Sequence, residues 1–264
     1  MEEVKGVFYF FLGGNDLEMT EIKKVLVSMG IPHLDKNLGW GAHASAYAEE
    51  ITSSAKRGEI PVLVELDNEF HSATEWNSEK NSVALPPNTV MIDHHGKRAS
   101  EPAAILQVLK LLGLSPTRWQ SLVAAHDSGG PPKLKLFGAT PEEFEEICAA
   151  SRAAQGITPK QETEAAIAIA TSEKFGGLVV VKSPHSKCGP ITDRLFPTWE
   201  DGKENVLILS EDGESNYFGD VRVRTALEER FGGWIGGDPL GNGFWGNGNV
   251  NQAEVLSLVK KLAQ

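Results

Sequence analysis

Cysteine is scarce in this chain, since Cys148 and Cys188 are the two in 264 residues. Their spacing is not that of a metal-binding motif, and we interpret both as reduced thiols rather than as a disulfide. No apolar run approaches the ~20 residues of a membrane span. The apolar segment "VFYFFL" at 7–12 lacks a basic leader and a small-residue cleavage site. These absences argue against a membrane protein and favour a cytoplasmic one.

Basic side chains are also in the minority. Asp and Glu number 36 against 25 Lys and Arg, which gives a formal net charge of −11. This balance argues against a protein that coats long duplex DNA, because such binding depends on many basic side chains that neutralise phosphates. A small phosphorylated substrate held through metal ions is compatible with it, since carboxylates around a divalent cation count as negative charge only while the metal is ignored.

Apolar segments alternate with amphipathic patterns through the first 155 residues. Short apolar runs predict buried strands, and apolar residues spaced three or four apart predict helices. The predicted strands are 4–12, 60–67 and 89–93, and the predicted helices are 16–30, 42–58, 101–113, 116–127 and 140–156. Strands separated by helices predict an α/β fold with a parallel sheet covered by helices on both faces.

The remainder of the chain predicts a second, smaller α/β domain. We set the boundaries at 1–155 for the first domain, 156–176 for a helical linker and 177–264 for the second domain. The predicted elements of the second domain are strands 178–183 and 205–210 and helices 220–233 and 251–264. Between these two helices the sequence is rich in glycine, but its aromatic side chains favour a shaped loop over a disordered linker.

Acidic side chains lie at the ends of the three strands predicted in the first domain. Asp16 follows the first strand, Asp67 ends the second, and Asp93 ends the third beside His94; Asp127 closes the helix that follows. Parallel strands bring their carboxyl ends to one edge of a sheet, where crowded carboxylates repel one another unless cations lie between them. Oxygen ligands with one or two imidazoles suit Mn²⁺ or Mg²⁺ better than zinc.

The segment "VMIDHHG" at 90–96 carries a family resemblance. Together with "VELD" at 64–67 and "AAHDSG" at 124–129, it resembles the DHH phosphoesterase superfamily. The segment "FGGWIGGDPLGNGFWG" at 231–246 is similar to the glycine-rich substrate loop of the associated C-terminal domain. The resemblance covers most of the chain. It implies one or two Mn²⁺ or Mg²⁺ ions and cleavage of a phosphodiester or phosphoanhydride bond in a small nucleotide, a short oligonucleotide or a phosphorylated metabolite.

The resemblance also assigns roles to individual residues. Asp67 would bridge two ions, and His94 and Asp127 would bind the second of them. Asp93 would contact His94 on the side away from the metal, because a carboxylate there fixes the tautomer of a ligating imidazole. His95 would face the phosphate. Each position also has an ordinary structural interpretation: Asp67 as a helix cap, Asp127 as a turn residue and the two histidines as loop residues.

The first metal motif departs from the family pattern. The family has His-x-x-x-Asp-x-Asp, whereas this chain has Leu12 in place of the histidine, then Asp16 and Glu18. Both acids are candidate ligands, and Glu18 has one more methylene of reach than an aspartate. Alternatively, Asn15 and Glu18 form a helix-capping arrangement that needs no metal. His43 is a candidate for the missing imidazole.

The glycine-rich segment departs from the pattern as well. Gly236, Gly237 and Asp238 occupy the place of the family's Gly-Gly-His, which contacts substrate. Glycine allows a phosphate or a base to approach the backbone closely, although the same residues are typical of a turn. Trp234 and Trp245 either stack on a base or pack in the core.

Two functions therefore follow from the sequence. The first is a metal-dependent phosphoesterase that acts on a small phosphorylated substrate. The second is a catalytically weakened relative that binds a nucleotide-like ligand as a sensor or partner module, because Leu12 supplies no metal ligand. Neither involves long duplex DNA or a membrane.

Overall fold

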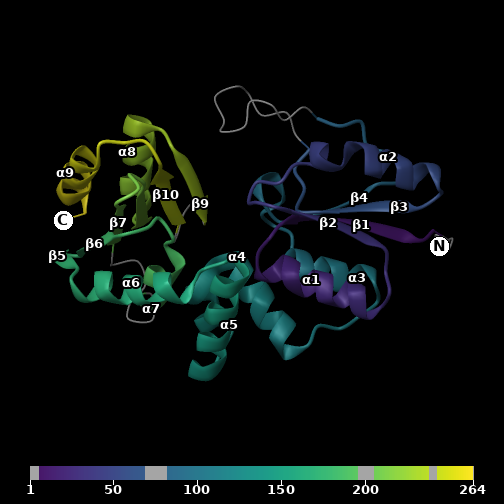
Figure 1. The fold of residues 1–264 in the computed structure, drawn as a ribbon, viewed down its shortest axis with the longest axis horizontal. Coiled ribbons are helices and arrows are strands. Elements are labelled where there is room, and N and C mark those ends of the chain that lie inside the picture. Colours follow the sequence, from purple (N-terminus) through teal and green to yellow (C-terminus); the bar gives the residue numbers. More distant parts are fainter. Residues whose placement is uncertain (1–5, 69–81, 196–204, 238–242, 264) are drawn as a thin grey trace. The chain divides into compact units, whose positions relative to one another are not determined.

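The chain divides into two compact units, which comprise residues 1–155 and 156–264. Figure 1 traces both units in a computed structural model. The structure describes residues 6–68, 82–195, 205–237 and 243–263. None of the helices within these ranges has the length and apolar character to span a membrane. Cys148 and Cys188 form no disulfide.

The first unit is built on a four-stranded parallel sheet in the order β2-β1-β3-β4. Its strands are β1 (Phe8–Gly14), β2 (His33–Leu38), β3 (Ile60–Val64) and β4 (Val90–Ile92). The expected parallel-sheet fold class is confirmed. Strand β2 was not predicted, because its polar sequence "HLDKNL" lies at an exposed edge and lacks an apolar run.

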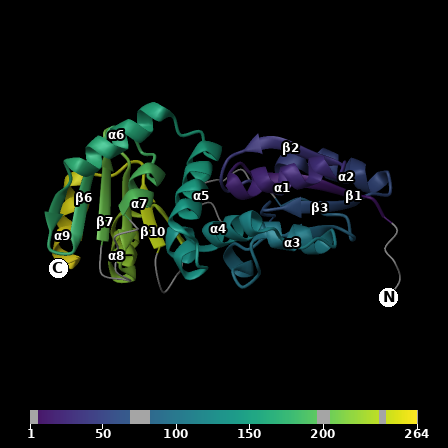
Figure 2. The same ribbon diagram turned by 90° about the horizontal axis from the view of Figure 1, so that it is seen from below.

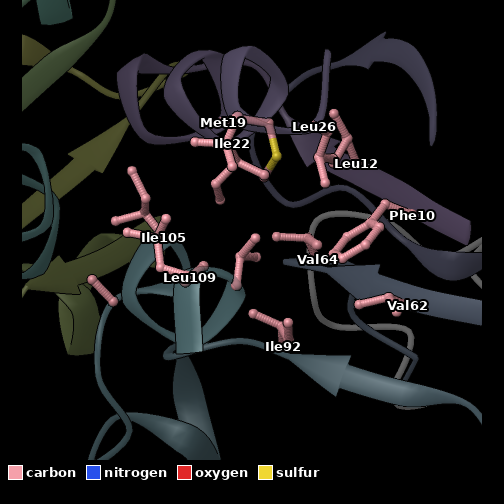
Figure 3. Packing of buried hydrophobic residues seen from close by; sticks show 14 of the residues in the cluster. Phe10, Leu12, Met19, Ile22, Leu26, Val62, Val64, Ile92, Ile105 and Leu109 are labelled. Atoms are coloured by element: carbon pink, nitrogen blue, oxygen red, sulfur yellow. The ribbon is translucent and has the colours of Figure 1, made fainter. Parts of the chain in front are cut away.

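Helices cover both faces of this sheet, as Figure 1 shows, and Figure 2 shows one of these faces from below. The helices of this unit are α1 (Leu17–Ser28), α2 (Ala48–Lys56), α3 (Ala104–Leu111), α4 (Arg118–Leu136) and α5 (Pro141–Ala154), with short turns η1 (Ala44–Tyr47) and η2 (Gly96–Arg98). Helix α4 packs on α1 and α3, and α5 packs on α4. Alternate residues of β1 point to opposite faces, as a strand requires. Phe10 and Leu12 pack against α1 and α3 (Figure 3), and Phe11 packs against Tyr47 and Ile51 on the side of α2.

Helix α4 is interrupted where its sequence reads "DSGGPP". Gly129 and Gly130 have non-helical backbone angles, and Gly130 has a φ of +61°. Two prolines follow. Because proline has no backbone N–H, they cannot donate hydrogen bonds to the carbonyl groups of the preceding turn. The first helical segment therefore ends just after Asp127, as the sequence predicted, and leaves that side chain at the end of a regular helix.

The second unit is built on a six-stranded mixed sheet in the order β5-β6-β7-β8-β10-β9. Its strands are β5 (Glu173–Phe175), β6 (Leu178–Ser183), β7 (Asn205–Ser210), β8 (Ser215–Gly219), β9 (Trp234–Gly237) and β10 (Gly243–Asn247). Only β6 and β7 are parallel; the other neighbours are antiparallel. This unit is the smaller α/β domain that was expected, and its glycine-rich segment contributes two strands where a loop was expected.

Helices also cover both faces of the second sheet. They are α6 (Pro159–Ala170), α7 (Gly189–Leu195), α8 (Val221–Phe231) and α9 (Gln252–Leu262). Ala165 and Ala168 of α6 pack with Val181 and Ile208 on one face, whereas α8 and α9 pack with Trp245 on the other. Helix α6, assigned to the linker by the sequence, thus packs within the second unit.

Candidate metal centre

Four side chains from four separate elements converge at the carboxyl edge of the parallel sheet. Glu18 comes from α1, Glu65 directly follows β3, His94 follows β4, and Asp127 comes from α4. One ligand atom from each lies within 4.8 Å of the others. His94 Nε2 is 2.6 Å from Asp127 Oδ2, 3.1 Å from Glu65 Oε1 and 3.6 Å from Glu18 Oε2. We call these four residues the acidic cluster.

The facing atoms of the acidic cluster are buried but lack hydrogen bonds of normal geometry. This holds for Glu18 Oε2, Glu65 Oε1, His94 Nε2 and Asp127 Oδ2. The Glu18 side chain is 0% exposed and those of Glu65 and His94 are 8% exposed. Buried polar atoms usually have partners, so four that point at one another without a bond mark a position suited to a bound cation.

Charge in the acidic cluster is unbalanced without such a cation. Burial lowers the pKa of His94, but the neighbouring carboxylates of Asp127, Glu18 and Glu65 outweigh this effect and raise the pKa to about 12. Burial raises the pKa of Glu18 well above its ordinary value; the imidazole of His94 opposes this shift, and the charges of Asp127 and Glu65 add to it. Three carboxyl groups and one imidazole therefore crowd together, and the raised pKa values of Glu18 and His94 both mean that the cluster favours added positive charge.

Glu18 is fixed by the amino end of α3. Its Oε1 accepts a hydrogen bond of 2.9 Å from the Ile105 N–H, one of the first amide groups of that helix. Such amides have no partner within the helix and favour negative charge. One carboxylate oxygen of Glu18 thus anchors the side chain, which leaves Oε2 aimed at His94. The sequence placed Glu18 among the ligands, and the structure brings it into the acidic cluster.

Glu65 occupies an unusual backbone conformation. Its φ is +50°, in the left-handed region that residues with a side chain rarely adopt, and its N–H donates to Ile92 O of the neighbouring strand. The turn brings the Glu65 carbonyl against Gly13, where a Cβ would lie 2.4 Å from that oxygen. Only glycine at position 13 leaves room for this turn, which directs the Glu65 carboxylate toward His94. Backbone strain of this kind is common at functional sites.

Glu65 was not among the residues selected from the sequence. Asp67, two residues later, was selected instead, and the structure leaves it outside the acidic cluster. The backbone of Asp67 bridges to the segment around His43: its N–H donates to Ala42 O, and its carbonyl accepts from Ala44 N–H. Within the described ranges, neither Asp67 nor His43 belongs to a group with metal-binding geometry. One feature of the sequence indicates Glu65 as a candidate: it is the first ionisable residue after the apolar run "IPVLV".

Leu12 and Asp16, in the unusual first motif, both have structural roles. Leu12 is fully buried in the apolar core between β1 and α1 (Figure 3), so a donor at this position would enter the core. Asp16 caps α1 by accepting a hydrogen bond of 2.8 Å from Met19 N–H. Burial, with the charges of Asp127 and Glu65, raises the pKa of Asp16 to about 7. Asp16 thus lies beside the acidic cluster as a helix cap, the role considered for Asn15.

The Asp93 carboxylate contacts the imidazole of His95 rather than that of His94. Asp93 Oδ1 accepts from the His95 backbone N–H at 2.9 Å and lies 3.0 Å from His95 Nδ1. This hydrogen bond is the main cause that raises the pKa of His95, and burial opposes it. The His95 side chain is 53% exposed and forms a second possible ligand group with Glu65 and His94. His95 is therefore the accessible imidazole of the site, oriented by Asp93.

The candidate substrate residues of the second unit lie in or beside β9. Gly236 and Gly237 belong to that strand, while Asp238 lies outside the described residues. The ring of Phe244 fills the space beside Gly236, where a Cβ would lie 2.4 Å from it. Trp245 is fully buried and donates from Nε1 to Gly232 O. Packing thus explains Trp245 and one glycine without a ligand, and a substrate role for Gly236, Gly237 and Asp238 stays a prediction.

No family model and no curated protein matches the sequence, but solved structures share its fold. The pGpG-specific phosphodiesterase PggH from Vibrio cholerae is 12% identical, with a TM-score of 0.50 over 97% of this chain and 98% of that chain. An exopolyphosphatase-related protein from Bacteroides fragilis is 10% identical, with a TM-score of 0.51 over 98% and 94%. A DHH domain from a protein named as a member of a ribosomal protein family is 13% identical, with a TM-score of 0.51 over 99% and 88%. The chain has the fold of DHH-family structures, which confirms at the level of the fold the resemblance that the motifs indicated.

Proposed function

We propose that the protein is a metal-dependent phosphoesterase that hydrolyses a phosphodiester or phosphoanhydride bond in a small nucleotide, a short oligonucleotide or a phosphorylated metabolite. The acidic cluster is the observation that carries this proposal. Its four buried ligand atoms face one another within 4.8 Å, at the sheet edge where α/β proteins bind ligands. Two of the solved structures with this fold are named as a phosphodiesterase and as exopolyphosphatase-related, which supports this reaction class.

The donor set suits a hard divalent cation. Glu18, Glu65 and Asp127 offer carboxylate oxygens and His94 offers one imidazole nitrogen, a combination that favours Mn²⁺ or Mg²⁺ over zinc. These four residues would hold one ion, and a second ion would share the carboxylate of Glu65 and take oxygens from a phosphorylated substrate. When bound, such ions lower the pKa of a coordinated water and neutralise charge on the phosphoryl oxygens.

The residues around the acidic cluster have separate tasks in this proposal. Asp93 holds the Nδ1 side of His95, so the other ring nitrogen is available to a phosphate oxygen. A protonated His95 would donate a hydrogen bond to that oxygen and offset its negative charge, with Asp93 at the other ring nitrogen. Asp16 keeps the first turn of α1 in place and thereby positions Glu18. Gly236, Gly237 and Asp238 remain the candidate substrate contacts of the second unit.

Leu12 favours a second candidate function. Because it is buried in the core and supplies no donor, the described residues give one complete ligand set and one that overlaps it. A protein that holds one ion or none and binds a nucleotide-like ligand without turnover, as a sensor or partner module, also fits this arrangement.

The test compares metal binding with turnover in matched variants. Calorimetry with Mn²⁺ is combined with hydrolysis of a dinucleotide, pyrophosphate and a phosphomonoester by the parent, Glu18→Gln and Glu21→Gln. Glu21 lies on the same helix and is similarly buried but pairs with Lys24, so it is the control. We expect Mn²⁺-dependent hydrolysis that is lost in Glu18→Gln and kept in Glu21→Gln. Binding of nucleotide without turnover would support the sensor. Absence of metal binding would refute the phosphoesterase, and absence of both metal and nucleotide binding would refute both functions.

A further inference from the structure

One exposed tryptophan lies at the same sheet edge as the acidic cluster. Trp40 is 79% exposed, whereas Trp245 is fully buried in the second unit. A single exposed apolar side chain is ordinary on a protein surface, so its exposure alone has no functional meaning. Its position relative to the acidic cluster is what distinguishes it.

Trp40 follows β2 at the carboxyl edge of the parallel sheet. Strand β2 ends at Leu38, which pairs with Gly14 at the end of β1. Because adjacent strands lie about 4.8 Å apart, the end of β2 is about 10 Å from the end of β3, where Glu65 begins the acidic cluster. The phosphate and the base of a nucleotide are separated by a ribose, which makes this spacing suitable for a phosphate at the cluster and a base at Trp40.

The backbone of Trp40 is held against the segment that leads to the acidic cluster. The Asn15 N–H donates to Leu38 O at 2.8 Å. A Cβ on Gly14 would lie 3.0 Å from Gly39 O and 3.3 Å from Trp40 Cα, so these two backbones are in close contact. The turn of Trp40 is therefore anchored two residues before the cap Asp16, although its indole faces solvent.

We propose that Trp40 is a specificity-determining residue, on whose indole a planar base of the substrate stacks while the phosphate binds at the acidic cluster. The proposal rests on the proposed function, because the carboxylates would repel a phosphate unless a cation is bound. A tryptophan offers a large rigid surface with few rotatable bonds, and base stacking of this kind tolerates any base. Hydrolysis would then favour nucleotides over phosphorylated sugars of equal charge.

The test measures affinities rather than turnover. AMP and ribose 5-phosphate are titrated by calorimetry, in the presence of Mn²⁺, into the parent, Trp40→Ala, Trp40→Phe and Val7→Ala. Val7 is 60% exposed and precedes β1 at the opposite edge of the sheet, so it is a matched control. We expect AMP to bind the parent more tightly than ribose 5-phosphate, and Trp40→Ala to weaken AMP by about 5- to 150-fold. Trp40→Phe should keep most of the affinity and Val7→Ala all of it.

Two further readouts separate the outcomes. Trp40→Ala should leave the affinities for Mn²⁺ and for ribose 5-phosphate unchanged, because it removes a base contact alone. Equal affinities of the parent for the two ligands, or equal losses for both in Trp40→Ala, would overturn the inference while the metal site stands. A parent that binds no Mn²⁺ would overturn the proposed function and this inference with it.

Discussion

Replacing Gly13 by alanine is the sharpest probe of how the fold positions a ligand of the acidic cluster. An added Cβ would lie 2.4 Å from Glu65 O, 2.7 Å from Val64 O and 2.9 Å from Glu65 C. All three are backbone atoms and cannot rotate away. Normal contact requires a separation of about 3.5 Å, so the Glu65 carbonyl must move by roughly 1 Å. We expect a loss of about 1 to 3 kcal/mol in unfolding free energy, as for other overpacked sites.

The same displacement should weaken metal binding. Metal–ligand distances tolerate changes of about 0.2 Å, so a shift of Glu65 removes or lengthens one of the four ligand contacts. Changes that act on a ligand through its support typically cost about 10- to 100-fold in affinity, and we expect this range for Mn²⁺ with Gly13→Ala. Calorimetry gives the affinity and urea unfolding gives the stability.

Two comparisons distinguish positioning from general damage. Gly39→Ala introduces a Cβ with no atom within 4 Å, so it should change neither property. If Gly13 acts through Glu65, Gly13→Ala combined with Glu65→Gln should bind Mn²⁺ no more weakly than Glu65→Gln alone, since coupled sites are not additive. A folded Gly13→Ala protein that binds Mn²⁺ as tightly as the parent would refute the reasoning.

Three other changes have clear expected results. His94→Ala should abolish tight Mn²⁺ binding, measured by calorimetry, and Asp93→Asn should reduce activity about 10- to 100-fold, measured by steady-state kinetics. If both variants lose the same amount of Mn²⁺ affinity, His94 is not distinguished from Asp93 as a metal ligand. Chelation of Mn²⁺ should lower stability by about 2.7 kcal/mol if the ion was present at 100 times its Kd, and an unchanged melting temperature would argue that no ion was bound. The pKa of Asp16, about 7 in the fold, lies above its ordinary 3.8, so stability present below pH 4 is lost as pH rises through 7. Asp16→Asn keeps a good helix cap and should stabilise the metal-free protein at pH 8, but not at pH 4, by on the order of 1 to 3 kcal/mol; urea unfolding at both values checks the sign.

The first unit was largely predictable because its apolar runs and its helix-ending glycines indicate the same element boundaries. The run "IPVLV" gave β3, and Gly30 and Gly58 end the two helical patterns with the left-handed φ that glycine favours. Strand β2 was missed because it is polar and at an edge, where pairing with β1 stabilises it rather than burial. In the second unit, the sequence of β9 and β10 predicts a loop, because glycine is unfavourable in strands. Their aromatic rings cover the glycines and supply the packing that glycine lacks.

Within the site, the sequence located the ligand types better than the ligand positions. His94, Asp127 and Glu18 were selected and converge. Asp67 was predicted as the acid that ends the strand in "VELD", and Glu65 was not a candidate. The strand instead ends at Val64, and a left-handed residue follows it directly. Periodicity cannot reveal such a turn, because it depends on the room that Gly13 leaves on the neighbouring strand.

Leu12 connects the core of the fold to the number of metal ligands that the site can offer. Its side chain is fully buried against Phe10 and Leu26, and an imidazole there would lose hydration without a partner. The apolar packing therefore excludes a ligand at this position for as long as α1 covers β1 as it does. Glu18 compensates from the same helix, because its longer side chain reaches His94 while α3 holds its other oxygen. The outcome is one compact group of candidate ligands from four elements, so a second ion would depend on a shared carboxylate and on oxygens that a phosphorylated substrate brings with it.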